Sequence, residues 1–219
     1  MLNRNKLYGF KLDKNSDYLE IGGGTGDLSF NMKNKGFNII LFIEPDKKKF
    51  EIASNKLEGI NCLNININEF KANQISPKTK ILTVIMQDVI EHIHEIDQKL
   101  FFNKLFTMYE KINFIGRTPN LKSPFGLRNS FGDNTHLHRF TDKSLRDFLK
   151  NIEFENIIVS GEGYRVTGIV SFLRYPAYFL ILLSSSIIFF FVFGSWEGFL
   201  TPNITFKSEK FKYHSTNHD

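Results

Sequence analysis

Four glycines interrupt an apolar run near the start of the chain, and their spacing is typical of a loop that approaches a ligand closely. The stretch reads DYLEIGGGTGDLSF, residues 17–30. Counted from Glu20, it gives the pattern acidic-x-G-x-G-x-G, with Gly22, Gly24 and Gly26 setting the spacing. Dinucleotide-binding folds prefer G-x-G-x-x-G, in which the last glycine comes one residue later. The spacing therefore disfavours a nicotinamide-dependent oxidoreductase.

A second acidic residue, Glu44, ends a later apolar run, NIILFIEPD. A carboxylate at the carboxyl end of the second strand can accept hydrogen bonds from both hydroxyls of a ribose. The alternative is that Glu44 caps a helix that starts near Asp46, a place that Pro45 would suit. Together with the glycine loop, Glu44 predicts a site for a nucleoside.

Two carboxylates and a histidine, Asp88, Glu91 and His92, follow a third apolar run in VIMQDVIEHIHE. Ligands of open parallel sheets bind at the carboxyl ends of the strands, so these side chains are expected at the site. His92 is a candidate general base, because an unperturbed imidazole titrates near neutral pH. Two alternatives stay open. Glu91 and His92 can simply begin a solvated helix, or the acidic residues, His92 and a later histidine can bind Mg, Mn or Zn.

The stretch 119–140 shows no clear periodicity and is rich in hydrogen-bonding side chains. Loops of this length inside a compact domain are usually lids or binding loops. His136 is the second candidate base, and a structural histidine bonded to a loop carbonyl is the alternative for it.

Alternating strand and helix patterns position these residues and predict an α/β fold with an open, mostly parallel sheet. Strands are expected at 17–21, 38–43, 60–65, 80–86, 111–118, 155–161 and 203–208. One apolar helix face is expected between the fourth and fifth strands, with Phe101, Leu105, Met108, Tyr109 and Ile112. Thr141 is expected to cap a later helix that buries Leu145, Phe148, Leu149 and Ile152.

Composition sets the broader limits. The 219 residues fit a single domain over 1–219 with a sizeable core. The net charge is +5, but no dense basic run or basic helix is present, so no nucleic-acid partner is expected.

Cys62 is the only cysteine, which favours a reducing compartment, and residues 1–18 carry charges throughout rather than a secretion signal. We expect a cytoplasmic location, which includes a place at the inner face of the membrane.

The segment 175–196 contains no charged residue and is long enough to cross a bilayer, which takes about 20 apolar residues. A single crossing would place the last strand on the opposite side of the bilayer from the other six strands. Two helical crossings need more residues than this segment has. Three alternatives stay open: an interfacial anchor, consistent with Tyr175, Tyr178 and Trp196 near the ends, a buried or dimer-forming flap, and a true span. The serines at 184–186 are candidates for a bend.

These motifs resemble those of class I S-adenosylmethionine-dependent methyltransferases, over residues 17–161 and the strand near 203–208. The resemblance implies a Rossmann-like seven-stranded sheet with helices on both faces, an antiparallel last strand and, here, an apolar insertion before it. It implies that the loop, including Gly23, wraps the methionine part of the cofactor S-adenosylmethionine and that Glu44 holds the ribose. Glu20 and Asp88 belong to the same implied cofactor site.

The resemblance also implies an adenine contact after the third strand, where the family has an acidic residue and this chain has Asn66, with Ile67 beside it. The tripeptide IEH at 90–92 is similar to a segment of ubiquinone-biosynthesis O-methyltransferases. The pattern PN…S…GD.TH…FT..SL resembles a subgroup found with bacterial surface-polysaccharide biosynthesis.

The predicted function is methyl transfer to an oxygen of a lipid-linked sugar, glycan or related membrane metabolite, with His92 or His136 as the base. One alternative is a quinone-type or small-molecule O-methyltransferase, which would act on soluble phenolic acceptors. The other is a membrane protein that binds the cofactor without turnover. The motifs do not identify the acceptor, a metal or an oligomeric state.

Overall fold

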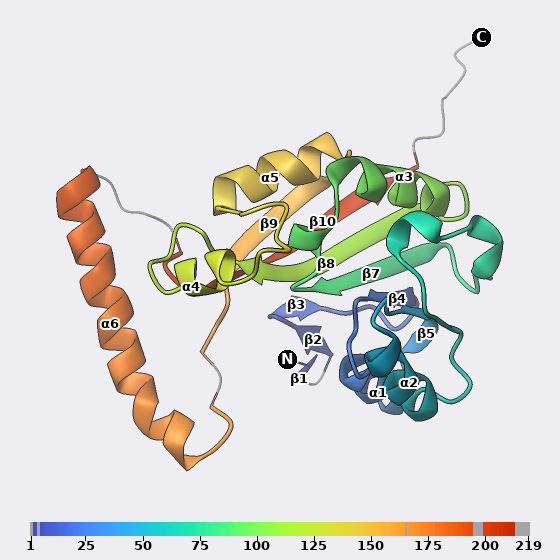
Figure 1. Ribbon diagram of the computed structural model, residues 1–219, viewed down its shortest axis with the longest axis horizontal. Helices are drawn as coiled ribbons and strands as arrows, with labels where there is room; N and C mark the ends of the chain where they lie inside the picture. Colours follow the sequence, from blue (N-terminus) through green and yellow to red (C-terminus); the bar gives the residue numbers. More distant parts are fainter. Residues whose placement is uncertain (1, 4, 165, 195–198, 213–219) are drawn as a thin grey trace, which may run out of the picture.

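The computed structural model describes residues 2–3, 5–164, 166–194 and 199–212, and its centre is a seven-stranded sheet (Figure 1). The strands lie in the order β6-β5-β4-β7-β8-β10-β9. All neighbouring pairs are parallel except that β10 runs antiparallel to both β8 and β9. The strands are β4 (Asp17–Ile21), β5 (Asn38–Ile43), β6 (Cys62–Leu63), β7 (Ile81–Gln87), β8 (Lys111–Pro119), β9 (Glu155–Gly161) and β10 (Asn203–Phe211). The predicted fold class and the antiparallel last strand are confirmed.

Helices cover both faces of this sheet, because alternate strand residues point to opposite faces. Helices α3 (Glu95–Phe106) and α5 (Asp142–Asn151) contribute Phe101, Phe102 and Leu149 to the larger core. Helix α1 (Asp27–Asn34) packs Leu28 and Met32 on the other face. Helix α2 (Lys47–Lys56) covers Phe42 with Ala53. Thr141 caps α5 by accepting a hydrogen bond from the Ser144 amide at 3.1 Å, as predicted.

Two predicted elements are too long by several residues, and one helix was not predicted. The expected strand 60–65 is only the two-residue β6, because asparagines follow it and the backbone turns into the short 3₁₀ helix η1 (Ile67–Glu69). Helix α3 ends at Phe106, so Tyr109 lies in the turn and Ile112 in β8 rather than on one helix face. The stretch 119–140 contains the short helix α4 (Leu127–Phe131).

A small antiparallel sheet precedes the main one and was not predicted. It consists of β1 (Leu2–Asn3), β2 (Lys6–Leu7) and β3 (Phe10–Lys11). Leu7 packs into the same core as α1. The Tyr8 hydroxyl donates to the Gln87 side chain at the end of β7, so this N-terminal sheet is fastened to the strand that leads into the candidate site.

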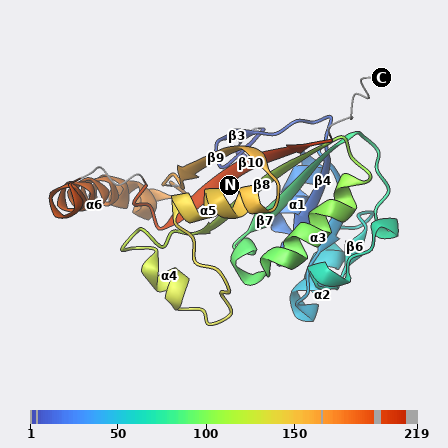
Figure 2. The ribbon, with the colours of Figure 1, turned by 90° about the horizontal axis from the view of Figure 1, so that it is seen from above.

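The chain leaves the sheet after β9, forms the long helix α6 (Ile169–Phe193), and returns as β10 (Figure 1). Gly161 of β9 pairs with Ile204 of β10, so the insertion starts and ends at the same end of these two paired strands. The helix stands beside the sheet and its covering helices (Figure 2), and none of its residues is buried. It starts before residue 175, and the last two residues of the predicted segment 175–196 lie outside the described residues.

Candidate active site

The glycine loop joins β4 to α1 in the position expected from the sequence. Gly22, Gly24 and Gly26 all have positive φ angles, between 58° and 74°, where a side chain would be strained. A Cβ on Gly23 would lie 2.3 Å from the Phe42 ring, so that glycine is required for packing. The space beside Gly24 is open, which leaves room for a ligand against the backbone.

Glu44 lies at the end of β5, facing the loop. It is 4% exposed, and its Oε2 accepts a hydrogen bond from the Gly24 amide at 2.7 Å. Its Oε1 accepts from the Asp46 amide at 3.0 Å. The contact with the start of α2 that was considered from the sequence is therefore present, and the same carboxylate lines the cavity, where binding of a ribose stays a prediction. Each oxygen retains acceptor capacity for a ligand hydroxyl.

Glu20 lies beneath the loop instead of lining the cavity. It accepts hydrogen bonds from the amide and hydroxyl of Ser29 in α1 and from Gln87 at 3.3 Å. Burial raises the pKa of Glu20 to about 7. Tyr8, Gln87, Glu20 and Ser29 thus form one hydrogen-bonded chain that links the N-terminal sheet, β7 and α1 behind the glycine loop.

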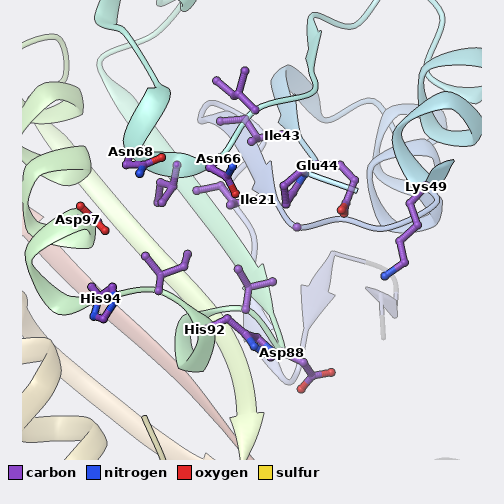
Figure 3. A pocket seen from close by; sticks show the side chains of 16 residues that line it. Ile21, Ile43, Glu44, Lys49, Asn66, Asn68, Asp88, His92, His94 and Asp97 are labelled. Carbon is purple, nitrogen blue, oxygen red and sulfur yellow. The ribbon is translucent and has the colours of Figure 1, made fainter. Parts of the chain in front are cut away.

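A cavity of about 370 Å³ opens at the carboxyl ends of β4, β5 and β7. Figure 3 shows Glu44 and Asn66 on one side of it and Asp88 and His92 on the other. Gly22 and Ile67 line it as well, so the cavity gathers six of the predicted site residues. Its size is in the range of small-molecule sites. Sequence reasoning missed four polar lining residues, Lys49, Asn68, His94 and Asp97, which come from helix starts and turns without a motif.

Asp88 ends β7 with a positive φ angle of 53° and forms an ion pair across the strand ends. Arg117 of β8 donates to both carboxylate oxygens of Asp88, and its Nη1 donates to Glu162 at 3.1 Å. The bidentate contact fixes Asp88 between the first cavity and a second one. Arg117 was missed because a single arginine inside an apolar strand has no recognisable spacing.

The second cavity, of about 560 Å³, shares Asp88 and His92 with the first. Its other lining residues are Glu91, Arg117, Pro119, Arg128, Asn129, Gly132, Asp133, His136 and Asn203. Most of them belong to the loop 119–140. Backbone amides of Leu137 and His138 both donate to the Glu91 carbonyl, at 2.9 and 3.0 Å, and this folds the loop back over the site.

This fold-back brings His136 against His92 and Glu91, a proximity that the sequence could not establish. The two imidazole ring centres lie 4.6 Å apart, and His136 Nε2 lies 4.0 Å from Glu91 Oε1. His136 Nδ1 lies 3.0 Å from the Ser130 carbonyl, which can only accept, so Nδ1 carries the proton and Nε2 of the neutral ring is bare. His136 can therefore be both a histidine that is held by a loop carbonyl and a base, which are the two alternatives considered from the sequence.

Glu91 is the most unusual group at the site. It is 1% exposed, and neither carboxylate oxygen has a hydrogen-bond partner among the described residues. Burial raises the pKa of Glu91 to about 8. Ligand atoms of Glu91, His92 and His136 all lie within 4.8 Å of one another, and one carboxylate with two imidazoles suits Zn or Mn. The cluster can therefore hold a proton or a divalent cation.

Comparison with known proteins decides the family. A family model described as a methyltransferase domain matches residues 2–159. The chain belongs to this methyltransferase family. Its sheet order and antiparallel last strand are those of the class I enzymes, and its cofactor is S-adenosylmethionine. No curated protein matches the sequence.

Solved structures share the fold of this methyltransferase at low sequence identity. A SAM-dependent methyltransferase from Archaeoglobus fulgidus superposes with a TM-score of 0.60 at 15% identity, covering 89% of this chain and 86% of that one. One from Clostridium acetobutylicum gives 0.55 at 14%, covering 90% and 85%. The plantazolicin methyltransferase BpumL, in complex with a triazolic desmethylPZN analog and SAH, gives 0.54 at 13%, covering 90% and 77%. At these identities the likeness concerns the fold.

Proposed function

We propose that this methyltransferase transfers the methyl group of S-adenosylmethionine to an oxygen of a lipid-linked sugar, glycan or related membrane metabolite. The observation that carries the reaction type is the junction of the two cavities at Asp88 and His92. The first cavity suits a nucleoside, with Glu44 toward the ribose and Asn66 and Ile67 toward the adenine. The second suits the acceptor, with His136 in its wall.

S-adenosylmethionine supplies a methyl group that is already activated, so the protein has to align the acceptor and take up one proton. The bare Nε2 of His136 is the proposed proton acceptor. The proton that the acceptor oxygen gives up would pass to this nitrogen as the oxygen took the methyl carbon in place of the sulfur, with S-adenosylhomocysteine as the leaving group. The Ser130 carbonyl holds the ring by its other nitrogen. His92, anchored through Nδ1 to the Thr135 hydroxyl at 2.9 Å, is the second candidate base.

A divalent cation is the second candidate mechanism for this cluster, because buried carboxylate oxygens without partners are costly unless they bind a proton or a cation. Glu91, His92 and His136 would hold the ion, which would acidify the acceptor hydroxyl. Dialysis against a chelator distinguishes the two. Loss of turnover that Mn²⁺ or Zn²⁺ restores would assign the cluster to a cation, and unchanged turnover would assign it to a base.

The acceptor class rests on α6. The second cavity shares two lining residues, Arg117 and Asn203, with a third cavity of about 270 Å³ whose wall includes Tyr164 and Tyr178 of the insertion. An acceptor whose lipid part lies beside α6 could therefore reach the junction with its head group. The proposed organisation is one methyltransferase domain over 1–219 with an apolar insertion, working at the inner face of the membrane.

The test is transfer of labelled methyl from S-adenosylmethionine into host extracts that are separated into membrane-lipid and soluble fractions. The matched inactive control is Gly24→Arg, which fills the open space in the loop. We expect label in the lipid fraction. Label confined to soluble phenolic or other small acceptors would favour the small-molecule O-methyltransferase, and binding of the cofactor without any label would favour a non-catalytic protein.

A further inference from the structure

Helix α6 is the largest apolar surface of the described chain that no other part of it covers. The mean hydropathy of an 18-residue stretch of it is 2.2, and by length and composition it is the one described helix that could cross a membrane. Leu180 is 60% exposed and Phe191 is 80% exposed. Soluble proteins rarely expose so large a contiguous apolar surface without a partner.

The helix has two different faces. With 3.6 residues per turn, the spacings of three, four and seven place Ser171, Arg174, Tyr178 and Ser185 on one stripe. The opposite stripe carries five exposed apolar residues and one exposed serine, namely Ile169, Leu173, Leu180, Ser184, Ile187 and Phe191. We call these the polar stripe and the apolar stripe. A helix that crosses a bilayer as a single span has no need of such a difference, whereas a helix in the interface does.

Hydroxyl groups in the middle of α6 are already paired within the helix. Ser184, Ser185 and Ser186 donate to the carbonyls of Leu180, Ile181 and Leu182, each at 2.8 to 2.9 Å. The helix is continuous over its 25 residues, without a break at the serines. Paired hydroxyls suit hydrocarbon surroundings, where water cannot satisfy them.

Chain connectivity limits how α6 can meet a membrane. The helix is about 37 Å long at 1.5 Å per residue, and β9 and β10 on either side of the insertion are paired with each other. If α6 spanned the bilayer, the nine connecting residues 194–202 would have to return through the hydrocarbon in extended form, at most about 30 Å. Extended backbone in hydrocarbon lacks hydrogen-bond partners, which costs several kcal/mol per group.

The segment that leads from β9 into α6 packs against the first turns of the helix, beside the third cavity. The Tyr164 hydroxyl donates to the Ser171 carbonyl at 3.0 Å, and the Tyr164 ring lies 4.6 Å from that of Tyr178. Tyr178 belongs to the polar stripe and lines the third cavity with Arg117. The polar stripe is thereby on the side of the catalytic domain at this end of the helix, which leaves the apolar stripe for the partner.

We propose that α6 lies in the plane of a phospholipid bilayer, with the apolar stripe in the acyl region and the polar stripe toward the catalytic domain, and that it holds the acceptor cavity at the membrane surface. This mode of binding is independent of the methylated group. It holds whether the acceptor is a lipid or a soluble molecule.

Vesicle flotation of the full chain tests the inference. The probe is phosphatidylcholine vesicles with and without phosphatidylglycerol. Leu180→Lys with Ile187→Lys places two charges on the apolar stripe, and the matched control, Ser171→Lys with Ser185→Lys, places two on the polar stripe. We expect the first pair to lower the bound fraction at least tenfold and the second to leave it within about threefold. Binding of S-adenosylhomocysteine by both variants shows that the domain is folded.

Depth measurement separates an in-plane helix from a span. Single cysteines at 173, 180 and 187, in a Cys62→Ser background, carry a fluorophore that is quenched by lipids labelled at known depths. The inference predicts equal depths at the three positions. Depths that change by about 10 Å per seven residues indicate a span and overturn it. Absence of vesicle binding, equal loss in both double variants, or a lipid-free dimer that Leu180→Lys dissociates would each overturn it too.

Discussion

His136 Nε2 and Glu91 Oε1 lie 4.0 Å apart, although they come from a loop and a 3₁₀ turn far apart in the sequence. Two backbone amides that donate to the Glu91 carbonyl maintain this proximity. The site thus combines a bare imidazole nitrogen with a buried carboxyl whose pKa is raised to about 8 by burial. Proton uptake or cation binding at this place is the chemistry that the fold makes available.

His136→Asn should lower kcat by about 10²- to 10⁴-fold, because it removes the proposed proton acceptor. Cofactor affinity should stay unchanged, since His136 does not line the first cavity. Steady-state kinetics and calorimetry with S-adenosylhomocysteine measure the two effects. If His92→Asn lowers kcat by more than His136→Asn does, the assignment of the base moves to His92.

Glu44→Ala should weaken binding of S-adenosylhomocysteine by about 1.5–3 kcal/mol, because charge-assisted hydrogen bonds to the ribose are lost. This corresponds to roughly 10- to 150-fold in Kd. Glu51→Ala, at an exposed position of α2, is the matched control. Equal affinity of both variants and the wild type would remove Glu44 from the cofactor site.

Glu20→Gln should make stability less sensitive to pH. The folded protein holds the Glu20 proton up to a pKa of about 7, against an ordinary value of 4.5, so it binds more protons than the unfolded chain between these values. The contribution of Glu20 to stability is therefore present at low pH and is lost as pH rises to about 7. Urea unfolding at pH 5, 6, 7 and 8 should show a smaller decline for the variant than for the wild type. Parallel profiles would show that Glu20 titrates normally.

Asn120→Ala should destabilise the junction between the loop 119–140 and the end of the insertion. The Asn120 amide donates to the carbonyls of Phe199 and Thr201, at 2.7 and 3.0 Å, and the residue is 1% exposed. Leaving these two partly buried carbonyls unpaired should cost about 1–3 kcal/mol in the free energy of unfolding. Chemical denaturation measures it, with Asn34→Ala at the exposed end of α1 as the control. A change as small as that of Asn34→Ala would contradict this role.

Local sequence patterns predicted the limits of a strand or helix well where its own residues determine them. Strands 17–21 and 38–43 have the predicted limits, because both are apolar runs bounded by polar residues or glycine. The strand at 60–65 was overestimated because its asparagines allow a strand or a turn equally, and hydrogen bonding with β5 reaches only Cys62 and Leu63.

The candidate site was predictable only in part. The glycines and Glu44 are found by spacing, since each lies directly after an apolar strand run. Arg117 and the approach of His136 to Glu91 depend on tertiary contacts of strand ends and a folded-back loop, which leave no periodic signal. The apolar segment was recognised from its length, but the polar stripe begins at Ser171, before the run of uncharged residues, and so only the helix bounds reveal it.

A crystal structure with S-adenosylhomocysteine tests the central claim most directly. The account predicts the ribose hydroxyls within hydrogen-bond distance of Glu44, the adenine beside Asn66 and Ile67, and the sulfur directed past Asp88 toward the cavity that holds His136. A nucleoside bound outside the cavity between β4, β5 and β7, or a sulfur directed away from His136, would contradict it.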